Sequence, residues 1–379
     1  MNFQLNEEHK LIRDTAREFA QNELLPGVIE RDETQSFPHE QIKKMGALGL
    51  MGMMVSPDYN GAGMDTVSYV LAIEEISKVD ASAGVIMSAN NSLVCWGLEK
   101  YGTEAQKQKY LTKLATGEII GGFCLSEPEA GSDATSQKTT AIEKEDHYLL
   151  NGVKNWITNG GVASVYLVIA QSDVTKKHRG INVFIVEKET EGVAVGPKEN
   201  KLGIRGSDTH SILFTDVKVP KENRIGKEGF GFQFAMETLA GGRIGIAAQA
   251  LGIASGAYER SLQYSQERKS FGKEISRHQA IAFKLADMAT EIEASRLLCM
   301  NSALHKDQGM DYNLSSSMAK LFCADAAMRI TVEAVQVHGG YGFVKEYHVE
   351  RMMRDAKITQ IYEGTSEIQK IVISRSILA

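Results

Sequence analysis

Three short segments of this 379-residue chain place glycine beside serine, threonine or acidic side chains. Segment 123–133 (FCLSEPEAGSD) offers hydroxyls and approachable backbone N–H groups, which suit the edge of a cofactor or a phosphate. Segment 336–342 (QVHGGYG) carries three glycines where the end of a helix needs only one, so its backbone is expected to approach another group closely. In segment 361–367 (IYEGTSE), Glu363 and Gly364 precede two hydroxyls that can cap a final helix.

Ordinary interpretations of these segments remain open on chemistry alone. Segment 123–133 is more simply a plain turn. Glu363 is a solvated acid near a helix start, which is the usual situation of glutamate. Trp156, in an apolar stretch of the middle third, fits a β-domain core as well as a ligand wall.

Several other chemistries have no support in the sequence. The nine histidines form no HExxH or HxxH pair, and no GxSxG or P-loop motif occurs. The nearest approach to a dinucleotide fingerprint, Gly229-Phe-Gly231 followed by Phe234, lacks the third glycine. The four scattered cysteines form no CxxC, which is typical of a reducing compartment without structural zinc or disulfides.

Composition limits the partners and the location. The formal charge is −6, from 42 basic and 48 acidic residues, so we expect no nucleic-acid partner. The first ten residues, MNFQLNEEHK, carry acids where a signal peptide carries bases, and no run approaches the roughly 20 apolar residues that span a bilayer. We therefore expect a soluble protein of the bacterial cytoplasm, without signal or transit peptide and without membrane insertion.

The chain changes character twice along its length. Helical periodicity covers the opening third, with Asn6 as a cap, helices near 42–48, 67–79 and 83–98, and a capping box of Thr103 with Gln106. Short β-rich runs follow, including 148–150 and 153–157 joined by an Asn151-Gly152 turn. Long helical runs then cover 234–265, 278–304 and 315–337. The pattern predicts a helical domain at 1–118, an antiparallel β-domain at 119–226 and a helical bundle at 227–379.

Taken together, these features resemble the acyl-CoA dehydrogenase family over essentially the whole chain. Segment 123–133 is similar to one family signature, and the stretch from Gln336 through Arg354 and Asp355 is similar to a second. IYEGTSEIQ and FKLADM look most like the short-chain branch, the butyryl-CoA dehydrogenases. The resemblance implies a mainly α fold with a central β-domain: an N-terminal helical domain, a middle antiparallel β-barrel or sandwich and a C-terminal four-helix bundle.

The resemblance also implies FAD as cofactor, bound without a dinucleotide fingerprint. It implies that the Thr158 hydroxyl points toward flavin N5 and that Trp156 forms an apolar wall. It assigns to FAD the residues Phe123, Leu125, Ser126, Gly131, Ser132, Trp156, Ile157, Thr158, Arg268, Phe271, Gln279, Gln336, Gly339, Gly340, Thr365, Ser366 and Glu367. Among these, Arg268, Phe271, Gln279 and the 336–340 turn match residues that a neighbouring chain contributes. A homotetramer, arranged as a dimer of dimers, is therefore expected.

The implied reaction is α,β-dehydrogenation of a short-chain acyl-CoA, butyryl-CoA to crotonyl-CoA. Glu363 removes the α-proton, the β-hydride passes to flavin N5, and electron-transferring flavoprotein takes the electrons. The implied substrate contacts are Ser132, Ala240, Gly241, Gly242, Arg243 and Gly364. Ala240 replaces an Asp of close relatives, which removes one expected contact to CoA. The second family position for the base is Gly242 in this chain, and it has no side chain to abstract a proton.

Three alternatives accompany this interpretation. The chain could act on branched isobutyryl- or 2-methylbutyryl-CoA, could be an oxidase that passes electrons to oxygen, or could be a binding module without catalysis. The presence of Glu363, Thr158 and Arg268 argues against the module, which needs no carboxylate at the α-carbon. Chain-length preference depends on packing between helices near 89–98 and 245–251.

Overall fold

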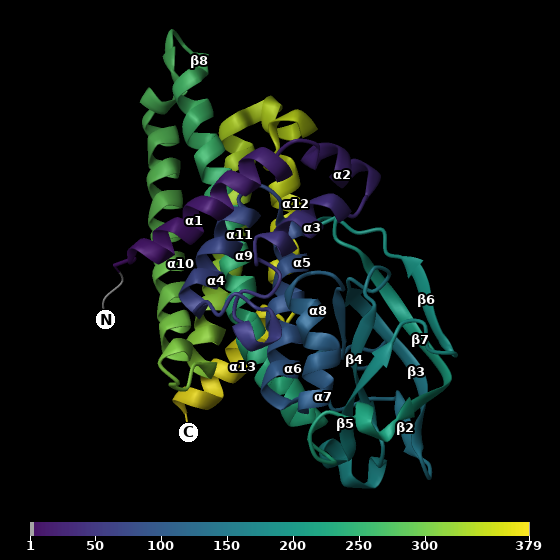
Figure 1. Ribbon diagram of the computed structural model, residues 1–379. Coiled ribbons are helices and arrows are strands. Elements are labelled where there is room, and N and C mark those ends of the chain that lie inside the picture. The colour runs from purple at the N-terminus through teal and green to yellow at the C-terminus, as the bar shows by residue number, and fades with distance from the viewer. Residues whose placement is uncertain (1–3, 379) are drawn as a thin grey trace.

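The computed structural model describes residues 4–378, in which helices from both ends of the chain lie beside a sheet built by the middle third (Figure 1). This arrangement confirms the expected fold of a helical part, a β part and a second helical part. The sheet lies to one side, and the two helical parts pack against each other in a single apolar core.

The N-terminal helices begin at the caps that the sequence predicts. Asn6 accepts a hydrogen bond from the His9 N–H at the start of α1, and Thr103 with Gln106 forms the capping box. The helices are α1 (Glu7–Phe19), α2 (Val28–Thr34), α3 (His39–Ala47), α4 (Thr66–Ser77), α5 (Ala81–Ser88), α6 (Trp96–Tyr101), α7 (Glu104–Gln106) and α8 (Thr112–Ala115). Segments η1 (Ala20–Leu24), η3 (Ala89–Cys95) and η4 (Lys107–Leu111) are π-helical, and η2 (Pro57–Tyr59) is a 3₁₀ turn.

The middle third forms a sheet of seven strands, with order β1-β4-β2-β3-β7-β6 and with β5 paired to β4. The strands are β1 (Gly121–Cys124), β2 (Thr140–Glu143), β3 (His147–Thr158), β4 (Val165–Gln171), β5 (Ile181–Glu187), β6 (Val193–Lys198) and β7 (Thr209–Pro220), with 3₁₀ turns η5 (Val174–Gly180) and η6 (Lys221–Asn223). Most pairs are antiparallel. The expectation of a purely antiparallel domain is wrong in one respect, because β4 has two parallel neighbours: β1 runs parallel to it, and so does β2, through one residue pair. These pairings join strands far apart in sequence, so local alternation does not reveal them.

The predicted turn at Asn151-Gly152 is also wrong. Strand β3 runs straight through it, and the register on β7 shifts between Leu150 and Gly152, as in a β-bulge. Asn151 exchanges hydrogen bonds with Asp216 of β7, at 3.0 and 2.8 Å. Gly152 is required because a Cβ there would lie 2.5 Å from Thr139 Oγ1. Asn-Gly suits a bulge as well as a turn, and neighbouring strands decide between them.

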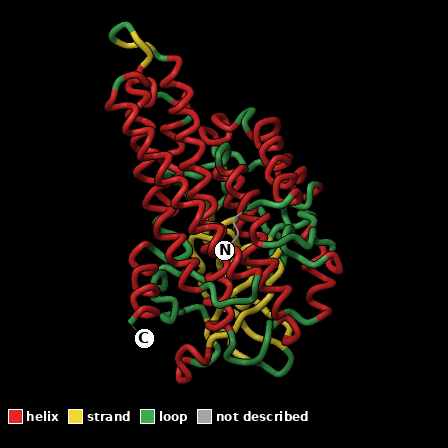
Figure 2. Tube along the Cα trace, turned by 90° about the vertical axis from the view of Figure 1, so that its left-hand side faces the viewer, coloured by secondary structure: helices red, strands yellow, loops and turns green. Residues whose placement is uncertain are grey.

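Long helices build the last third, as predicted. They are α9 (Gly231–Glu267), α10 (Gln279–Asp307), α11 (Asn313–His338), α12 (Val349–Thr359) and α13 (Ser366–Ile377), with 3₁₀ turns η7 (Ile275–Arg277), η8 (Gly339–Phe343) and η9 (Lys345–Tyr347). A two-stranded hairpin, β8 (Lys269–Ser270) and β9 (Lys273–Glu274), connects α9 to α10. Figure 2 shows this hairpin at one end of the long helices, away from the sheet.

Helix α9 occupies the centre of the molecule. Every residue from Ala240 to Ala257 is buried, and the helix contacts α4, α5, α10, α11 and α12. Its glycines allow this close packing. A Cβ on Gly252 or Gly256 would overlap the backbone at the end of α4. At these glycines α9 therefore presents backbone to the elements packed against it.

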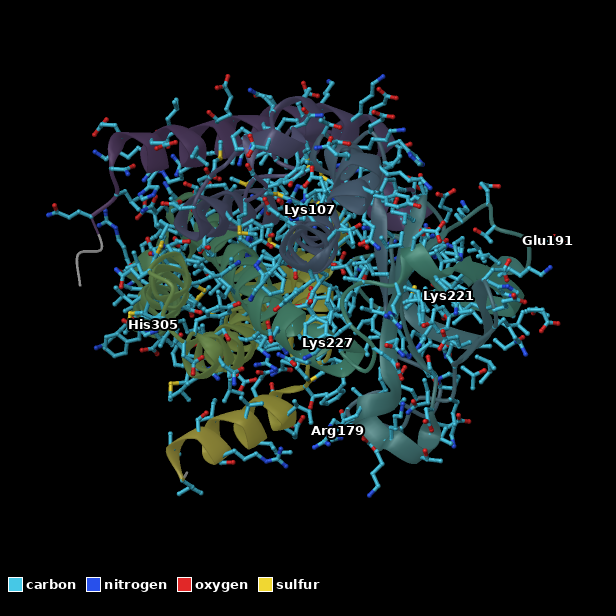
Figure 3. The ribbon with its side chains drawn as sticks, turned by 60° about the horizontal axis from the view of Figure 1, so that its bottom comes forward. Lys107, Arg179, Glu191, Lys221, Lys227 and His305 are labelled. Carbon is cyan, nitrogen blue, oxygen red and sulfur yellow. The ribbon has the colours of Figure 1, made fainter. Side chains whose placement is uncertain are left out.

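Two further kinds of feature, a membrane-spanning helix and a metal-binding cluster, are absent from the described residues. Within residues 4–378, no helix has both the length and the apolar character to cross a membrane. No cluster of three or more His, Cys, Asp or Glu side chains in that range is arranged to hold a metal ion. In Figure 3, Glu191 and Lys221 of the sheet region and His305 of α10 lie toward opposite sides, with the central helices between them.

Candidate active site

Glu363 lies on the short loop between α12 and α13, close to the middle of α9. The loop ends where Thr365 caps α13 by accepting a hydrogen bond from the Ile368 N–H, which confirms Thr365 rather than Ser366 as the cap. Glu363 has φ 50° and Gly364 has φ 92°, so two consecutive residues adopt the left-handed region. For glutamate this conformation costs about 1–3 kcal/mol and persists only where neighbours enforce it.

Two buried side chains enforce the loop conformation. Lys320 of α11 donates from Nζ to the Gly364 carbonyl oxygen at 2.7 Å. Gln369 of α13 donates from Nε2 to the same oxygen at 2.9 Å and to the Glu363 carbonyl oxygen at 3.3 Å. Both side chains are fully buried. The loop that carries Glu363 is therefore fixed by one cationic and one neutral donor.

Glu363 is half-buried as a residue, but its carboxylate oxygen Oε2 is buried and has no hydrogen-bond partner among the described residues. Burial raises the pKa of Glu363 to about 7, while the positive charges of Lys320 and Arg243 oppose that rise. A carboxylate with a pKa near neutrality and a free lone pair is suited to accept a proton.

Helix α9 leaves room for this carboxylate at Gly242. A Cβ atom built on Gly242 would overlap Glu363 Oε2 and would lie 2.8 Å from Leu93 Cδ2. Three residues further along, a Cβ on Gly245 would overlap the hydroxyls of Tyr69 and Ser88. Those hydroxyls are hydrogen-bonded to each other at 3.0 Å. The carboxylate and the Tyr69–Ser88 pair thus lie along one face of α9, about one helical turn apart.

The rest of segment 240–243 faces α10 and α11. Arg243 donates from Nη1 to Asn313 Oδ1 at 2.8 Å and to Ser317 Oγ at 3.1 Å, and its Nε has no partner within residues 4–378. A Cβ on Gly241 would have as its nearest neighbours Lys306 Nζ and Tyr312 Oη, each at 3.9 Å. Ala240 is buried and adds no polar group. The structure therefore brings the predicted substrate segment beside Glu363 and Gly364.

Segment 123–133 leads out of β1 and is fastened to β3 by a buried lysine. Lys154 donates from Nζ to Glu127 Oε1 at 2.6 Å and to the Leu125 carbonyl oxygen at 3.1 Å. The Asn155 N–H donates to the Ser126 carbonyl oxygen at 2.8 Å. Burial lowers the pKa of Lys154 to about 8. These contacts hold the loop in one position relative to β3.

The residues assigned to the flavin on this loop and on β3 are open to a ligand to different degrees. Trp156 is 63% exposed with φ 61°, so its interpretation as a sheet-core residue is wrong. Gly131 and Ser132 are exposed, and a Cβ on Gly131 would meet nothing within 4 Å. Phe123, Ser126 and Thr158 are half-buried, whereas Leu125 and Ile157 are buried. Trp156 therefore offers an apolar ring face to a planar ligand.

A second group of predicted cofactor residues lies at the other end of the long helices. Arg268 and Phe271 belong to the β8–β9 region, and Phe271 is 95% exposed. The Arg268 guanidinium lies 5.4 Å from the ring centre of Tyr341. Gln279 begins α10, and Gln336, Gly339 and Gly340, at the end of α11, are also exposed. In Figure 1 this end of the molecule, marked by β8, lies far from the sheet. One chain alone therefore does not bring the two groups together.

The remaining assigned residues line a cavity. Thr365, Ser366 and Glu367 border a space of about 450 Å³ at the start of α13. Arg329, Lys357 and Lys370 line the same space. Asp325 and Glu367 also line this space, so its three cations and two carboxylates leave a small positive charge beside a helix N-terminus, which suits an anionic group such as a phosphate.

Sequence reasoning did not assign roles to Lys154, Glu127, Lys320, Gln369 and Tyr69. A signal existed for the lysines. Lys154 is one of the alternating, inward-facing residues of β3, and the others are mostly apolar. Lys320 interrupts a run of small and apolar residues in α11. Lysine is almost never fully buried unless it is paired, so its presence on a core face indicates a specific partner. The partner itself is visible only in three dimensions.

Comparison with known proteins places this chain in a family. Models of the acyl-CoA dehydrogenase N-terminal, middle and C-terminal domains match residues 6–118, 122–217 and 229–378. The short-chain specific acyl-CoA dehydrogenase of Clostridium acetobutylicum is 52% identical over 377 residues, covering 100% of both chains.

Solved structures agree with this similarity. Butyryl-CoA dehydrogenase from Megasphaera elsdenii has a TM-score of 0.98 and 46% identity, with 100% of each chain covered. A chain in the structure described as electron transferring flavoprotein of Acidaminococcus fermentans, in work on flavin-based electron bifurcation, has a TM-score of 0.99 and 50% identity, again with full coverage of both chains. With matches of this extent, the chain belongs to the acyl-CoA dehydrogenase family, whose members are flavin-dependent oxidoreductases.

Proposed function

We propose that this chain is an FAD-dependent short-chain acyl-CoA dehydrogenase that converts butyryl-CoA to crotonyl-CoA, with Glu363 as the base. One observation carries the proposal. Glu363 lies half-buried on a strained loop, its buried oxygen Oε2 has no partner within the described chain, and the pKa of the carboxyl is raised to about 7. An acid held in this way at a cost to stability is typical of a functional site.

The α-proton of a thioester is weakly acidic, so its removal needs a well-placed base. Glu363 Oε2 accepts that proton, the α-carbon bonding pair becomes the C=C bond, and a hydride leaves the β-carbon. FAD, when bound, supplies the hydride acceptor at N5. Exclusion of water by the substrate desolvates Glu363 further and raises its pKa in the same direction as burial, which makes the carboxylate a stronger base.

The residues of this chain fit the proposed cofactor. Trp156 supplies an exposed ring, Thr158 a half-buried hydroxyl, and Gly131 an open backbone. Arg268 can bind a pyrophosphate through its paired donors. The separation of the Arg268 group from the Trp156 group supports a site shared between two chains, and we propose a homotetramer built as a dimer of dimers.

A short acyl chain is supported by the packing along α9. The helix is partly exposed before Ala240 and fully buried from Ala240 to Ala257, so a substrate that passes Gly242 goes deeper along the same face. One turn further, the hydroxyls of Tyr69 and Ser88 occupy the space beside Gly245. Two hydroxyls bonded to each other make a polar end that opposes a longer apolar chain.

The physiological partner and setting are further parts of the proposal. Electron-transferring flavoprotein is the proposed electron acceptor, supported by the similar chain in the Acidaminococcus structure. Relatives from Clostridium and Bacillus, together with four free buried cysteines in the described part of the chain, support the bacterial cytoplasm.

The experiment that tests this function is an anaerobic substrate panel. FAD-loaded protein is mixed with straight acyl-CoAs of three to twelve carbons and with isobutyryl- and 2-methylbutyryl-CoA, and flavin bleaching is followed. We expect butyryl-CoA to be fastest and Glu363→Gln to bind it without bleaching. Turnover is then measured with electron-transferring flavoprotein, and peroxide is measured in air. A preference for branched substrates, a high peroxide yield or the absence of bleaching would each contradict the proposal.

A further inference from the structure

We propose, on the basis of the function above, that Lys320 is a positioning residue for Glu363: its ammonium group fixes the base loop and supplies the positive charge that faces the carboxylate from α11. Nothing in the three glycine-rich segments indicates this role, because Lys320 lies 43 positions before Glu363 in the sequence. The evidence for this role is the hydrogen bonds that the buried side chains of Lys320 and Gln369 donate to the loop that carries Glu363.

The Lys320 ammonium has an unusual environment for a lysine. The side chain is completely buried, and within residues 4–378 its one hydrogen bond is to the Gly364 carbonyl oxygen at 2.7 Å. No carboxylate of the described chain forms an ion pair with it at short range. Burying a cation without such a partner is expensive unless nearby negative charge compensates. Glu363 is the largest source of compensating charge at Lys320.

Gln369 allows two effects of Lys320 to be distinguished: the hydrogen bond that holds the loop, and the positive charge near the carboxylate. It donates to the same Gly364 oxygen at 2.9 Å, and it is equally buried. Its amide carries no charge. Loss of Gln369 therefore loosens the loop alone, whereas loss of Lys320 loosens the loop and removes a positive charge.

The other groups around Glu363 do not replace that charge. Arg243 faces it from α9, with one arm of its guanidinium engaged by Asn313 and Ser317 of α11. Tyr69 of α4 and the adjacent Tyr362 are neutral, because burial raises the pKa of both hydroxyls. The negative charges of Asp325 in α11 and Glu367 in α13 also raise the pKa of Lys320, but by less than Glu363 does.

Two opposing effects, burial and nearby positive charge, together place the pKa of Glu363 near neutrality. Burial alone raises the pKa of Glu363, and Lys320 is the largest factor that lowers it again. Burial also lowers the pKa of Lys320 itself to about 8, so it is charged when Glu363 ionises. Without this neighbour a larger fraction of the carboxyl group would stay protonated at neutral pH, and that fraction cannot accept the α-proton.

The test compares four variants of the FAD-loaded enzyme across pH. Lys320→Met removes donor and charge, Lys320→Gln keeps a donor without charge, Lys320→Arg keeps both, and Gln369→Leu is the matched control. Two readouts are recorded: the single-turnover rate of flavin reduction by butyryl-CoA, and the infrared carboxyl band that disappears in Glu363→Gln. The infrared titration reports on Glu363 without requiring turnover.

We expect Lys320→Met and Lys320→Gln to move both titrations upward by about one pH unit, with rates about tenfold lower below pH 7. Lys320→Arg should stay near wild type, and Gln369→Leu should slow the reaction without moving either titration. If Lys320→Met does not fold, Lys320→Gln decides the question. Equal losses for the Lys320 and Gln369 variants at all pH values, with unmoved titrations, would overturn the proposal. A wild-type enzyme that butyryl-CoA does not reduce contradicts the proposed function instead, while the infrared titration still tests Lys320.

Discussion

A Cβ atom at Gly242 would overlap Glu363 Oε2, although the two residues are 121 positions apart in the sequence. A carboxylate carried by α9 at position 242 would therefore reach the same region that Glu363 reaches from the opposite loop. The two positions are mutually exclusive in space, since a side chain at one displaces the side chain at the other.

This relationship predicts that the base can be moved. The double variant Glu363→Gly, Gly242→Glu should recover at least about tenfold of the rate lost in Glu363→Gly alone. Glycine in place of Glu363 relieves the strain of φ 50° and vacates the space, whereas a glutamine there would keep it filled. Leu93 must move slightly to accept the new side chain. Anaerobic reduction by butyryl-CoA measures the recovery, and a double variant as inactive as the single one would contradict it.

Glu363 should also make stability depend on pH. Its folded pKa of about 7 lies above the ordinary value of 4.5, so the unfolded chain releases this proton first. The carboxylate therefore lowers stability progressively as pH rises from about 4.5 to above 7, by about 3 kcal/mol in total. Glu363→Gln should raise the melting temperature at pH 8 and change it little at pH 5. Thermal unfolding at both pH values tests this, and equal effects at both would show that the charge is not the cause.

Tyr69 should limit the length of the acyl chain. Tyr69→Phe removes the hydroxyl that fills the space beside Gly245, so a chain longer by one or two carbons should fit better. One methylene is worth about 0.8 kcal/mol, which corresponds to a rise of about fourfold in the ratio of kcat/KM for the five-carbon pentanoyl-CoA over butyryl-CoA. Tyr59→Phe, whose hydroxyl contacts Glu104 near the surface, serves as the control. An unchanged ratio would mean that Tyr69 does not end the pocket.

The sequence predicts the fold better than it predicts the details of the site. Helix periods and caps such as Asn6 and Thr103 act locally, so they can be identified without tertiary structure. The Asn151-Gly152 turn failed because the same dipeptide serves a bulge when β7 pairs alongside it. Lys320 was missed because a buried cation is identified by its partner, and Gly364 lies on another element. Residue types alone single out the segment around Glu363, but only the resemblance to a family assigns roles to Glu363 and Trp156, since their chemistry also fits a solvated acid and a sheet-core residue.

Arg268 should act on the cofactor of a neighbouring chain. Arg268 directly precedes β8 and lies beside Tyr341, whereas Trp156 belongs to β3, and β8 and β3 lie far apart (Figure 1). If two chains share each site, Arg268→Ala and Trp156→Ala should each weaken FAD retention. Co-assembled chains carrying one variant each should then contain some sites with neither defect. Flavin content after gel filtration of the mixed oligomer is the measurement. No recovery on mixing, or a monomer that retains FAD with Arg268 replaced, would contradict a shared site.

The buried pair of Lys154 and Glu127 should connect folding to cofactor retention. Lys154 holds the Leu125 carbonyl and Glu127 together, and both side chains are almost fully buried, so neither charge can be solvated if its partner is lost. Lys154→Met leaves a buried carboxylate and should cost about 3–5 kcal/mol, with faster loss of FAD because the 123–133 loop is released. Adding Glu127→Gln removes the isolated charge, so the double variant should recover part of the stability. It should not recover FAD retention, since the hydrogen bond to Leu125 is still missing. Thermal unfolding and flavin fluorescence release, measured on the same samples, separate these effects; a double variant that regains both would show that Lys154 acts only by neutralising Glu127.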